Sequence, residues 1–120
     1  MAPSAAMREP TYFLLVTLLD GPLHGHGIIK RAEEISGGRV RLAAGTLYAA
    51  LDRLTREGLV EAVQQETVNG RVRRYYALTV AGGIAVRTEA DRMAQAASLV
   101  ASRPSGRTVS PAVRPAVGPA

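Results

Sequence analysis

The sequence predicts a small, mainly α-helical protein with one β-hairpin, and three stretches of it carry this prediction. In the first, Leu47, Leu51 and Leu54 recur at the spacing of one helix face, directly before a strand-like run. In the second, Asn69-Gly70 joins two strand-like segments, which is the strongest short-range signal for a hairpin. In the third, near the C-terminus, apolar residues recur every three or four positions. The first stretch predicts a helix that buries its leucine face and exposes the other, and we call it the presented helix. Such a helix followed by a hairpin is typical of a winged helix-turn-helix, so we expect that fold plus a C-terminal dimerisation helix.

Length and composition narrow the class of protein. With 120 residues and 47% hydrophobic content, the chain is expected to form one small domain. It has no cysteine, which excludes disulfides and thiolate metal clusters and suits a cytoplasmic protein. The most apolar run, residues 12–19, is too short to cross a bilayer, so we expect no membrane contact. The sequence carries no phosphate-binding glycine loop, no nucleophile with a base and no ligand triad, so we expect no enzyme activity, no cofactor and no metal.

The positive charge is concentrated in one part of the chain. The formal net charge is +5, and residues 39–75 hold seven arginines against four acids. This excess flanks the presented helix, as the electrostatic footprint of a site for a polyanion would. The alternative is that these arginines form an ordinary solvated face of an arginine-rich protein.

The chain is expected to begin with a disordered leader, residues 1–9, followed by a first helix over residues 10–19. The apolar surface of that helix is broad enough to face both the core and a second subunit. A second helix is expected over residues 25–36. His24 and His26 at its start would point to different sides of the helix and lack a third ligand, so we interpret them as local hydrogen-bonding groups rather than a metal site.

The outward face of the presented helix supplies the first candidate DNA contacts. We expect Thr46 and Ala49 to help read base edges and Tyr48 to bond a phosphate, because all three lie near the start of the helix, where groove contacts are made. Arg53 and Arg56 add positive charge along the same helix.

The hairpin supplies the second group of candidates. Its strands are expected over about residues 59–66 and 72–78, and the returning segment combines cations with phenol groups, which suits a phosphate backbone. Alternation along a strand sends successive side chains to opposite faces, so we expect at least one tyrosine to belong to the core. The candidates for DNA contact are Arg71, Arg73 and Arg74, and they are followed by Tyr75 and Tyr76.

Thr79 is expected to cap a last helix over residues 80–101. Five of its residues form a heptad-like seam, which we interpret as an oligomer contact, with packing on the same domain as the alternative. The predicted organisation is a leader (1–9), a DNA-binding domain (10–79), a dimerisation helix (80–101) and a disordered basic Pro/Ala-rich tail (102–120). The seam residues are Val86, Ala90, Met93, Ala97 and Val100.

Six short blocks, in order and with matching spacing, resemble the signature of PadR-like transcriptional regulators over about residues 10–101. The resemblance implies a winged helix-turn-helix that forms a homodimer through its C-terminal helix and represses transcription at inverted repeats near promoters. In some members it also implies release by a small aromatic or drug-like effector. The blocks are residues 20–25 (DGPLHG), 45–48 (GTLY), 51–54 (LDRL), 57–60 (EGLV), 73–76 (RRYY) and 78–82 (LTVAG).

The sequence departs from the family pattern in places. His26 stands where the family often has tyrosine, Ala49 stands where it often has proline, and the C-terminal region is short. There is no tryptophan, so a tryptophan-lined drug pocket cannot be carried over. One rival function remains, a winged helix used as a protein interaction module without sequence-specific DNA binding. The arginines of the hairpin beside Arg53 and Arg56 favour DNA.

Overall fold

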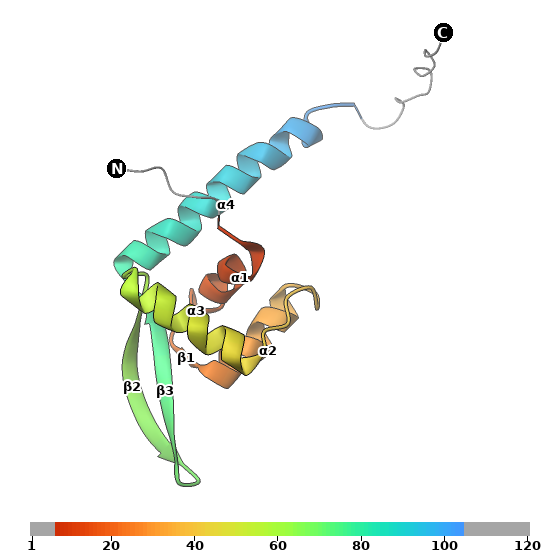
Figure 1. Cartoon of the computed structure of the whole chain (residues 1–120). Helices are drawn as coiled ribbons and strands as arrows, with labels where there is room; N and C mark the ends of the chain where they lie inside the picture. The colour runs from red at the N-terminus through yellow and green to blue at the C-terminus, as the bar shows by residue number, and fades with distance from the viewer. Residues whose placement is uncertain (1–6, 105–120) are drawn as a thin grey trace. The chain divides into compact units, whose positions relative to one another are not determined.

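The computed structural model describes residues 7–104 of the chain. These residues divide between two compact units, Met1–Glu89 and Ala90–Ala120. The predicted disordered leader, up to residue 6, and the predicted disordered tail, from residue 105, lie outside the described residues. The elements in chain order are α1 (Glu9–Thr17), β1 (Leu23–His24), α2 (Gly25–Ile35), α3 (Ala44–Arg56), β2 (Val60–Val68), β3 (Arg71–Leu78) and α4 (Val80–Ala101), as Figure 1 shows.

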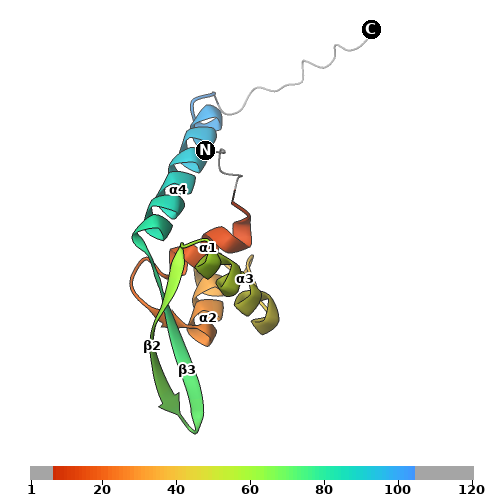
Figure 2. The same ribbon diagram turned by 60° about the vertical axis from the view of Figure 1, so that its left-hand side comes forward.

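The first unit has the predicted fold, a winged helix-turn-helix with α4 following it. Helices α1, α2 and α3 pack around one hydrophobic core, and the hairpin of β2 and β3 extends past them to its turn (Figures 1 and 2). The core gathers residues from every helix of this unit and from both long strands. It comprises Leu14, Leu15, Leu18, Ile28, Leu47, Leu51, Leu54, Val60, Tyr76 and Val86.

Helix α1 begins one residue earlier and ends two residues earlier than the predicted range 10–19. Glu9 lies in its first turn, and Met7 packs against the core, so the end of the predicted leader belongs to the folded domain. The hydroxyl of Thr17 donates to the carbonyl of Leu14 at 2.6 Å, which satisfies a polar group inside the core. The chain then leaves the helical conformation to reach β1, and Gly21 has a φ of +134° in that turn.

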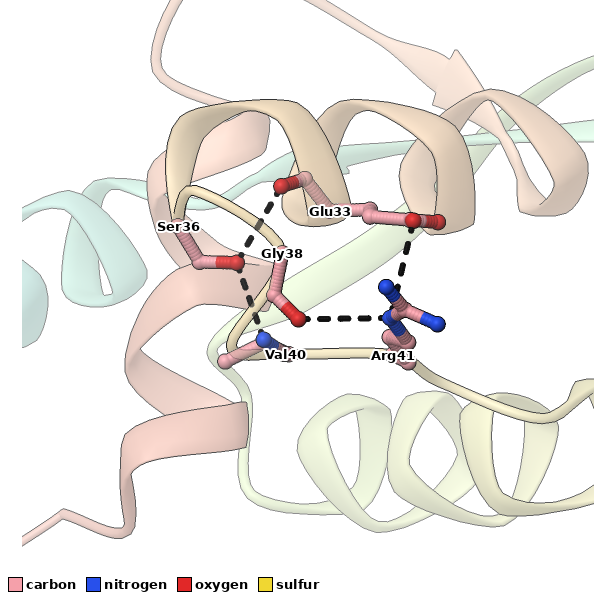
Figure 3. Close-up of polar contacts among 5 residues, drawn as sticks. All are labelled: Glu33, Ser36, Gly38, Val40 and Arg41. Carbon is pink, nitrogen blue, oxygen red and sulfur yellow. Dashed lines mark hydrogen bonds and ion pairs between the residues drawn. The ribbon is translucent and has the colours of Figure 1, made fainter.

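The turn between α2 and α3 is fixed by polar contacts (Figure 3). The hydroxyl of Ser36 donates to the carbonyl of Glu33 at 3.3 Å and accepts from the N–H of Val40 at 2.9 Å. Arg41 donates to the carbonyl of Gly38 at 3.3 Å and pairs with the Glu33 carboxylate at 3.6 Å. Gly38 has a φ of +86°, a conformation that favours glycine. Together these contacts set the direction in which α3 leaves the turn.

The sheet has three antiparallel strands in the order β1-β3-β2, one more strand than the sequence predicted. In β1, Leu23 pairs with Tyr76 and His24 pairs with Tyr75. This strand is only two residues long and is followed directly by α2, so it leaves no periodic pattern in the sequence.

The predicted hairpin is confirmed. Both central residues of its turn have positive φ, +51° at Asn69 and +77° at Gly70, as the tight turn that joins twisted strands requires. Its strands run longer than predicted, from Val60 to Val68 and from Arg71 to Leu78, with an irregularity in register between Ala62 and Gln64.

Thr79 anchors the start of α4 to the turn that joins α3 to the wing, the hairpin of β2 and β3. Its hydroxyl accepts from the N–H of Gly82 at 3.0 Å, which confirms the predicted cap, and donates to the carbonyl of Gly58 at 2.6 Å. Gly82 lies against the backbone of Leu59, where a Cβ would collide with the carbonyl oxygen. This junction therefore fixes how α4 leaves β3.

Val86, the first residue of the predicted dimer seam, belongs to the core of its own chain. It is 2% exposed, so the alternative of packing on its own domain holds for this residue. In the second unit, the other seam positions on α4 lie at or near the surface, and Val100 is 77% exposed. Among the described residues, no helix is both long and apolar enough to cross a membrane.

We predict that Thr79→Val lowers the free energy of unfolding by about 1–2 kcal/mol, because it removes both hydrogen bonds of the hydroxyl while keeping the side-chain shape. Thr88→Val, at an exposed position of the same helix, is the control and should change stability by less than about 0.5 kcal/mol. Urea unfolding followed by circular dichroism measures both values. Equal losses in the two variants would contradict the assigned cap.

Candidate nucleic-acid interface

Helix α3 presents the predicted outward face. Its three leucines are at most 1% exposed, so the helix cannot rotate without uncovering them. The five candidate residues of this helix are exposed, with Tyr48 at 47%. They are Thr46, Tyr48, Ala49, Arg53 and Arg56.

Tyr48 reaches from α3 to the start of α2. Its hydroxyl and ring lie so close to Gly25 that a Cβ at that glycine would collide with them. Gly25 is buried, and α2 begins there with no side chain capping its free N–H groups. Because Gly25 has no side chain, Tyr48 can lie beside the free N–H groups at the start of α2.

Arg53 is engaged within its own chain. Its guanidinium donates to the hydroxyl of Thr11 on α1 at 3.0 Å and lies 3.8 Å from the carboxylate of Glu57. Its proposed contact with DNA stays a prediction. Arg56, one turn later, makes no ion pair within residues 7–104, so it is the available cation of α3.

The wing holds its arginines in two different states. Arg73 lies 3.8 Å from the carboxylate of Glu66, which also accepts from the hydroxyl of Tyr75 at 3.2 Å. Arg71 and Arg74 are exposed and have no ion pair in the described part of the chain. The expectation that at least one tyrosine is core is confirmed by Tyr76, and alternation places Arg74 on the same strand face as Tyr76.

The wing, the start of α2 and Tyr48 enclose a groove with a volume of about 410 Å³. None of the described residues that line it is an acid. The groove brings together candidate residues that are far apart in the sequence, and it also includes His24 and His26, which are not among the predicted DNA contacts. Its lining is His24, Gly25, His26, Tyr48, Val68, Asn69, Arg71, Val72, Arg73 and Arg74.

His24 is held in this groove by its neighbours. Its ring centroid lies 5.5 Å from that of Tyr75, edge to face, because β1 pairs these two residues. Partial burial lowers the pKa of His24, the charges of Arg73 and His26 lower it further, and Glu66 acts in the opposite direction. The position of His24 in the groove could not be predicted from the sequence, because it depends on β1, a two-residue strand that pairs with β3.

A second concavity, of about 510 Å³, lies on the other flank of α3. Its lining includes Arg8, Thr46, Ala49 and Arg56, so a residue assigned to the disordered leader borders the candidate face. Positive charge therefore flanks α3 on two sides. Within residues 7–104, no three His, Asp or Glu side chains gather in a way that could hold a metal ion.

Most of the arginines in residues 39–75 are paired with acids of the same chain. Such exposed pairs contribute only about 0–1 kcal/mol each, so a phosphate can replace the carboxylate at little cost. Arg56, Arg71 and Arg74 remain unpaired among the described residues. The pairs are Arg39 with Glu9, Arg41 with Glu33, Arg53 with Glu57 and Arg73 with Glu66.

Residues 14–88 match the model of the Transcriptional regulator PadR-like family. The chain is 40% identical over 88 residues to an uncharacterised 37.1 kDa protein of transposon TN4556 from Streptomyces fradiae, covering 73% of this chain and 24% of that protein. It is 39% identical over 67 residues to the transcriptional regulator Rv3488 of Mycobacterium tuberculosis, covering 56% of this chain and 59% of that protein. The chain thus spans about a quarter and about three fifths of the lengths of these two relatives.

The fold is also similar to that of Bacillus subtilis PadR, whose crystal structure was determined in complex with operator DNA. The TM-score is 0.60 at 23% sequence identity, and the match covers 87% of this chain and 54% of the PadR chain. At this identity the likeness concerns the fold alone.

We predict that Gly25→Ala is more destabilising in the natural sequence than in a Tyr48→Ala background, because the new methyl group collides with the tyrosine. The difference, a coupling free energy between contacting residues, should be about 0.5–3 kcal/mol. Urea unfolding of the two single variants and the double variant measures it. If Gly25→Ala had the same effect in both backgrounds, the contact between Tyr48 and Gly25 would be wrong.

Proposed function

The chain belongs to the PadR-like family of transcriptional regulators, and on that premise we propose that it binds double-stranded DNA as a homodimeric repressor at inverted-repeat promoter sites. Members of this family are regulators rather than enzymes. The observation that carries the proposal is the juxtaposition of the exposed face of α3 with unpaired arginines of the wing. As a DNA-binding regulator, the protein would act in the cytoplasm.

Helix α3 is proposed to enter the major groove, which is about 12 Å wide and admits an α-helix. Thr46 and Ala49 are short and exposed, so they let the helix approach closely and offer methyl groups, and in Thr46 a hydroxyl, to base edges. Tyr48 lies to one side, at the start of α2, where its hydroxyl would donate to a backbone phosphate.

The wing is proposed to hold the neighbouring backbone or minor groove. Arg71 and Arg74 are free to bind phosphates, whereas Arg73 would first exchange its contact with Glu66. This distribution argues against the rival function of a protein interaction module, because unpaired arginines around a groove without acids suit a polyanion better than an apolar partner surface.

The homodimer is proposed to form through α4. This helix exposes large apolar side chains in both units, including Ile84 at 62% and Leu99 at 61%, which a single chain leaves in water. With Val86 in the core, the proposed seam keeps Ala90, Met93, Ala97 and Val100. A symmetric dimer would place two copies of α3 about 34 Å apart, one turn of DNA, or a multiple of it.

The resemblance implies a small-molecule effector for some members, and the first unit has a concavity of suitable size for such a ligand. Its volume is about 690 Å³, and it is lined by Leu54, Leu59, Ile84 and neighbouring residues of α1 and α4. We propose this concavity as the first place to look for such a ligand.

The direct test of the proposed function is a binding titration with duplex from the region upstream of the chain's own gene, at several salt concentrations. Sequence-specific binding predicts a much higher affinity for that duplex than for a scrambled one of equal length. Equal and weak affinity for both duplexes would favour the protein interaction module.

We predict that Arg74→Ala lowers the slope of log affinity against log salt by about one unit per lost phosphate contact, or about two per dimer. Arg73→Ala should change the slope less, because Glu66 already neutralises that guanidinium. Lys30→Ala, an exposed cation of α2 that does not line the groove, is the matched control. An unchanged slope in Arg74→Ala would remove the wing from the interface.

We predict that Ala97→Glu splits the dimer, because symmetry brings two like charges to the seam. Light scattering should then report the 12.7 kDa monomer at micromolar concentrations where the natural chain is dimeric. Gln95→Glu introduces the same charge on the same helix, away from the seam, and should leave the dimer intact. A dimer that persists in Ala97→Glu would place the contact elsewhere.

A further inference from the structure

His24 occupies a position in the groove that the proposed function has not yet used. It ends β1, where its backbone pairs with Tyr75, and it is also the residue that precedes the first turn of α2. Its ring lies beside that of Tyr75 and against Gly27, where a Cβ would come within 3.3 Å of two ring atoms. Its contacts with Tyr75 and Gly27 therefore restrict the rotation of the imidazole.

The groups around His24 come from every element that borders the groove. Their balance is positive, because Glu66, the one acid near the ring among the described residues, already contacts Arg73 and Tyr75. In the free protein, partial burial and the charges of Arg73 and His26 hold the pKa of His24 below its ordinary value, so the ring is mainly neutral near pH 7. The titratable and charged groups are Glu66 from β2, Arg71, Arg73, Arg74 and Tyr75 from β3 or its start, His26 from α2 and Tyr48 from α3.

We propose that this groove holds a backbone phosphate of bound DNA and that His24 takes up a proton when the phosphate enters, so that DNA affinity rises as pH falls. The proposal rests on the proposed function and deepens it, since it assigns a further contact residue and a pH dependence to the same interface.

The direction of the effect follows from charge. A phosphate next to the ring favours the imidazolium, so the pKa of His24 is higher in the complex than in the free protein. The extra affinity is then fully present below the pKa of the free protein and is lost as pH rises through the pKa of the complex. Affinity should change about tenfold for each unit by which DNA raises this pKa.

The size of the groove and its lining fit this ligand. A volume of about 410 Å³ accommodates a phosphate with its flanking sugar, and the groove opens beside the exposed face of α3 and the wing. Tyr48 and the unpaired Arg71 and Arg74 would hold the phosphate together with the imidazolium. A partly buried, neutral histidine needs no partner charge in the free protein.

The test is proton uptake on DNA binding, measured by calorimetry in buffers of different ionisation enthalpy between about pH 5 and 8. Duplex of any sequence serves as the probe, because phosphate contacts carry no sequence information. The natural chain should take up protons as it binds. His24→Gln should lose this uptake, while His26→Gln, two residues away in the same groove, should keep it.

A second measurement keeps the test valid if His24→Gln folds poorly. Side-chain nitrogen NMR of the natural chain should show the pKa of His24 rising when duplex is added. Inorganic phosphate alone should not reproduce that rise, and an equal rise with phosphate would make the groove a site for free anions rather than for DNA.

Three results overturn the proposal. They are binding of duplex without proton uptake, uptake that survives in His24→Gln, and uptake lost only in His26→Gln. In each of these cases the proposed function stands, because DNA still binds. Failure to bind duplex at any pH would instead overturn the proposed function and this proposal together.

Discussion

The burial of the leucine face of α3 is the constraint on which the candidate site depends. Leu47, Leu51 and Leu54 are almost completely removed from water, and each contributes about 1.5–3 kcal/mol by its burial. A rotation of the helix by one residue would turn each side chain by about 100° and bring Asp52 toward the core, where an unpaired carboxylate is costly. The buried leucines, which lie outside the candidate interface, therefore decide which face α3 exposes.

The wing acquires its position through contacts that the arginines themselves do not make. Thr79 ties the end of β3 to Gly58, and the β1 pairing ties the other side of β3 to the start of α2. Because β3 is held on both sides, the register of the hairpin decides which arginines meet an acid. Glu66 lies opposite Arg73, so Arg73 is engaged while Arg74, opposite Gln65, is not.

The features that the sequence predicted correctly are those with local signals. The leucine face of α3, the Asn69-Gly70 turn and the Thr79 cap each depend on residues a few positions apart, where helix period, backbone preference and capping chemistry act directly. The features that it missed depend on distant partners. Arg53 meets Thr11, 42 residues away, Val86 enters a core formed by other elements, and β1 exists only because β3 pairs with it. The roles of the candidate residues in DNA binding belong to a complex, so neither the sequence nor the fold of the free chain decides them.

Ion pairs within the chain reduce the exposed positive charge that the composition suggests. Composition suggested a cluster of seven arginines, but the pairs with Glu9, Glu33, Glu57 and Glu66 neutralise part of it at the surface. These pairs keep the free protein from carrying a dense and repulsive patch, and they are weak enough to yield to phosphates. The groove beside the wing is different, because its described lining has no acid and His24 in it is mainly neutral near pH 7. The positive charge of this groove therefore comes from Arg71, Arg73 and Arg74, where the wing meets the start of α2 and Tyr48 of α3.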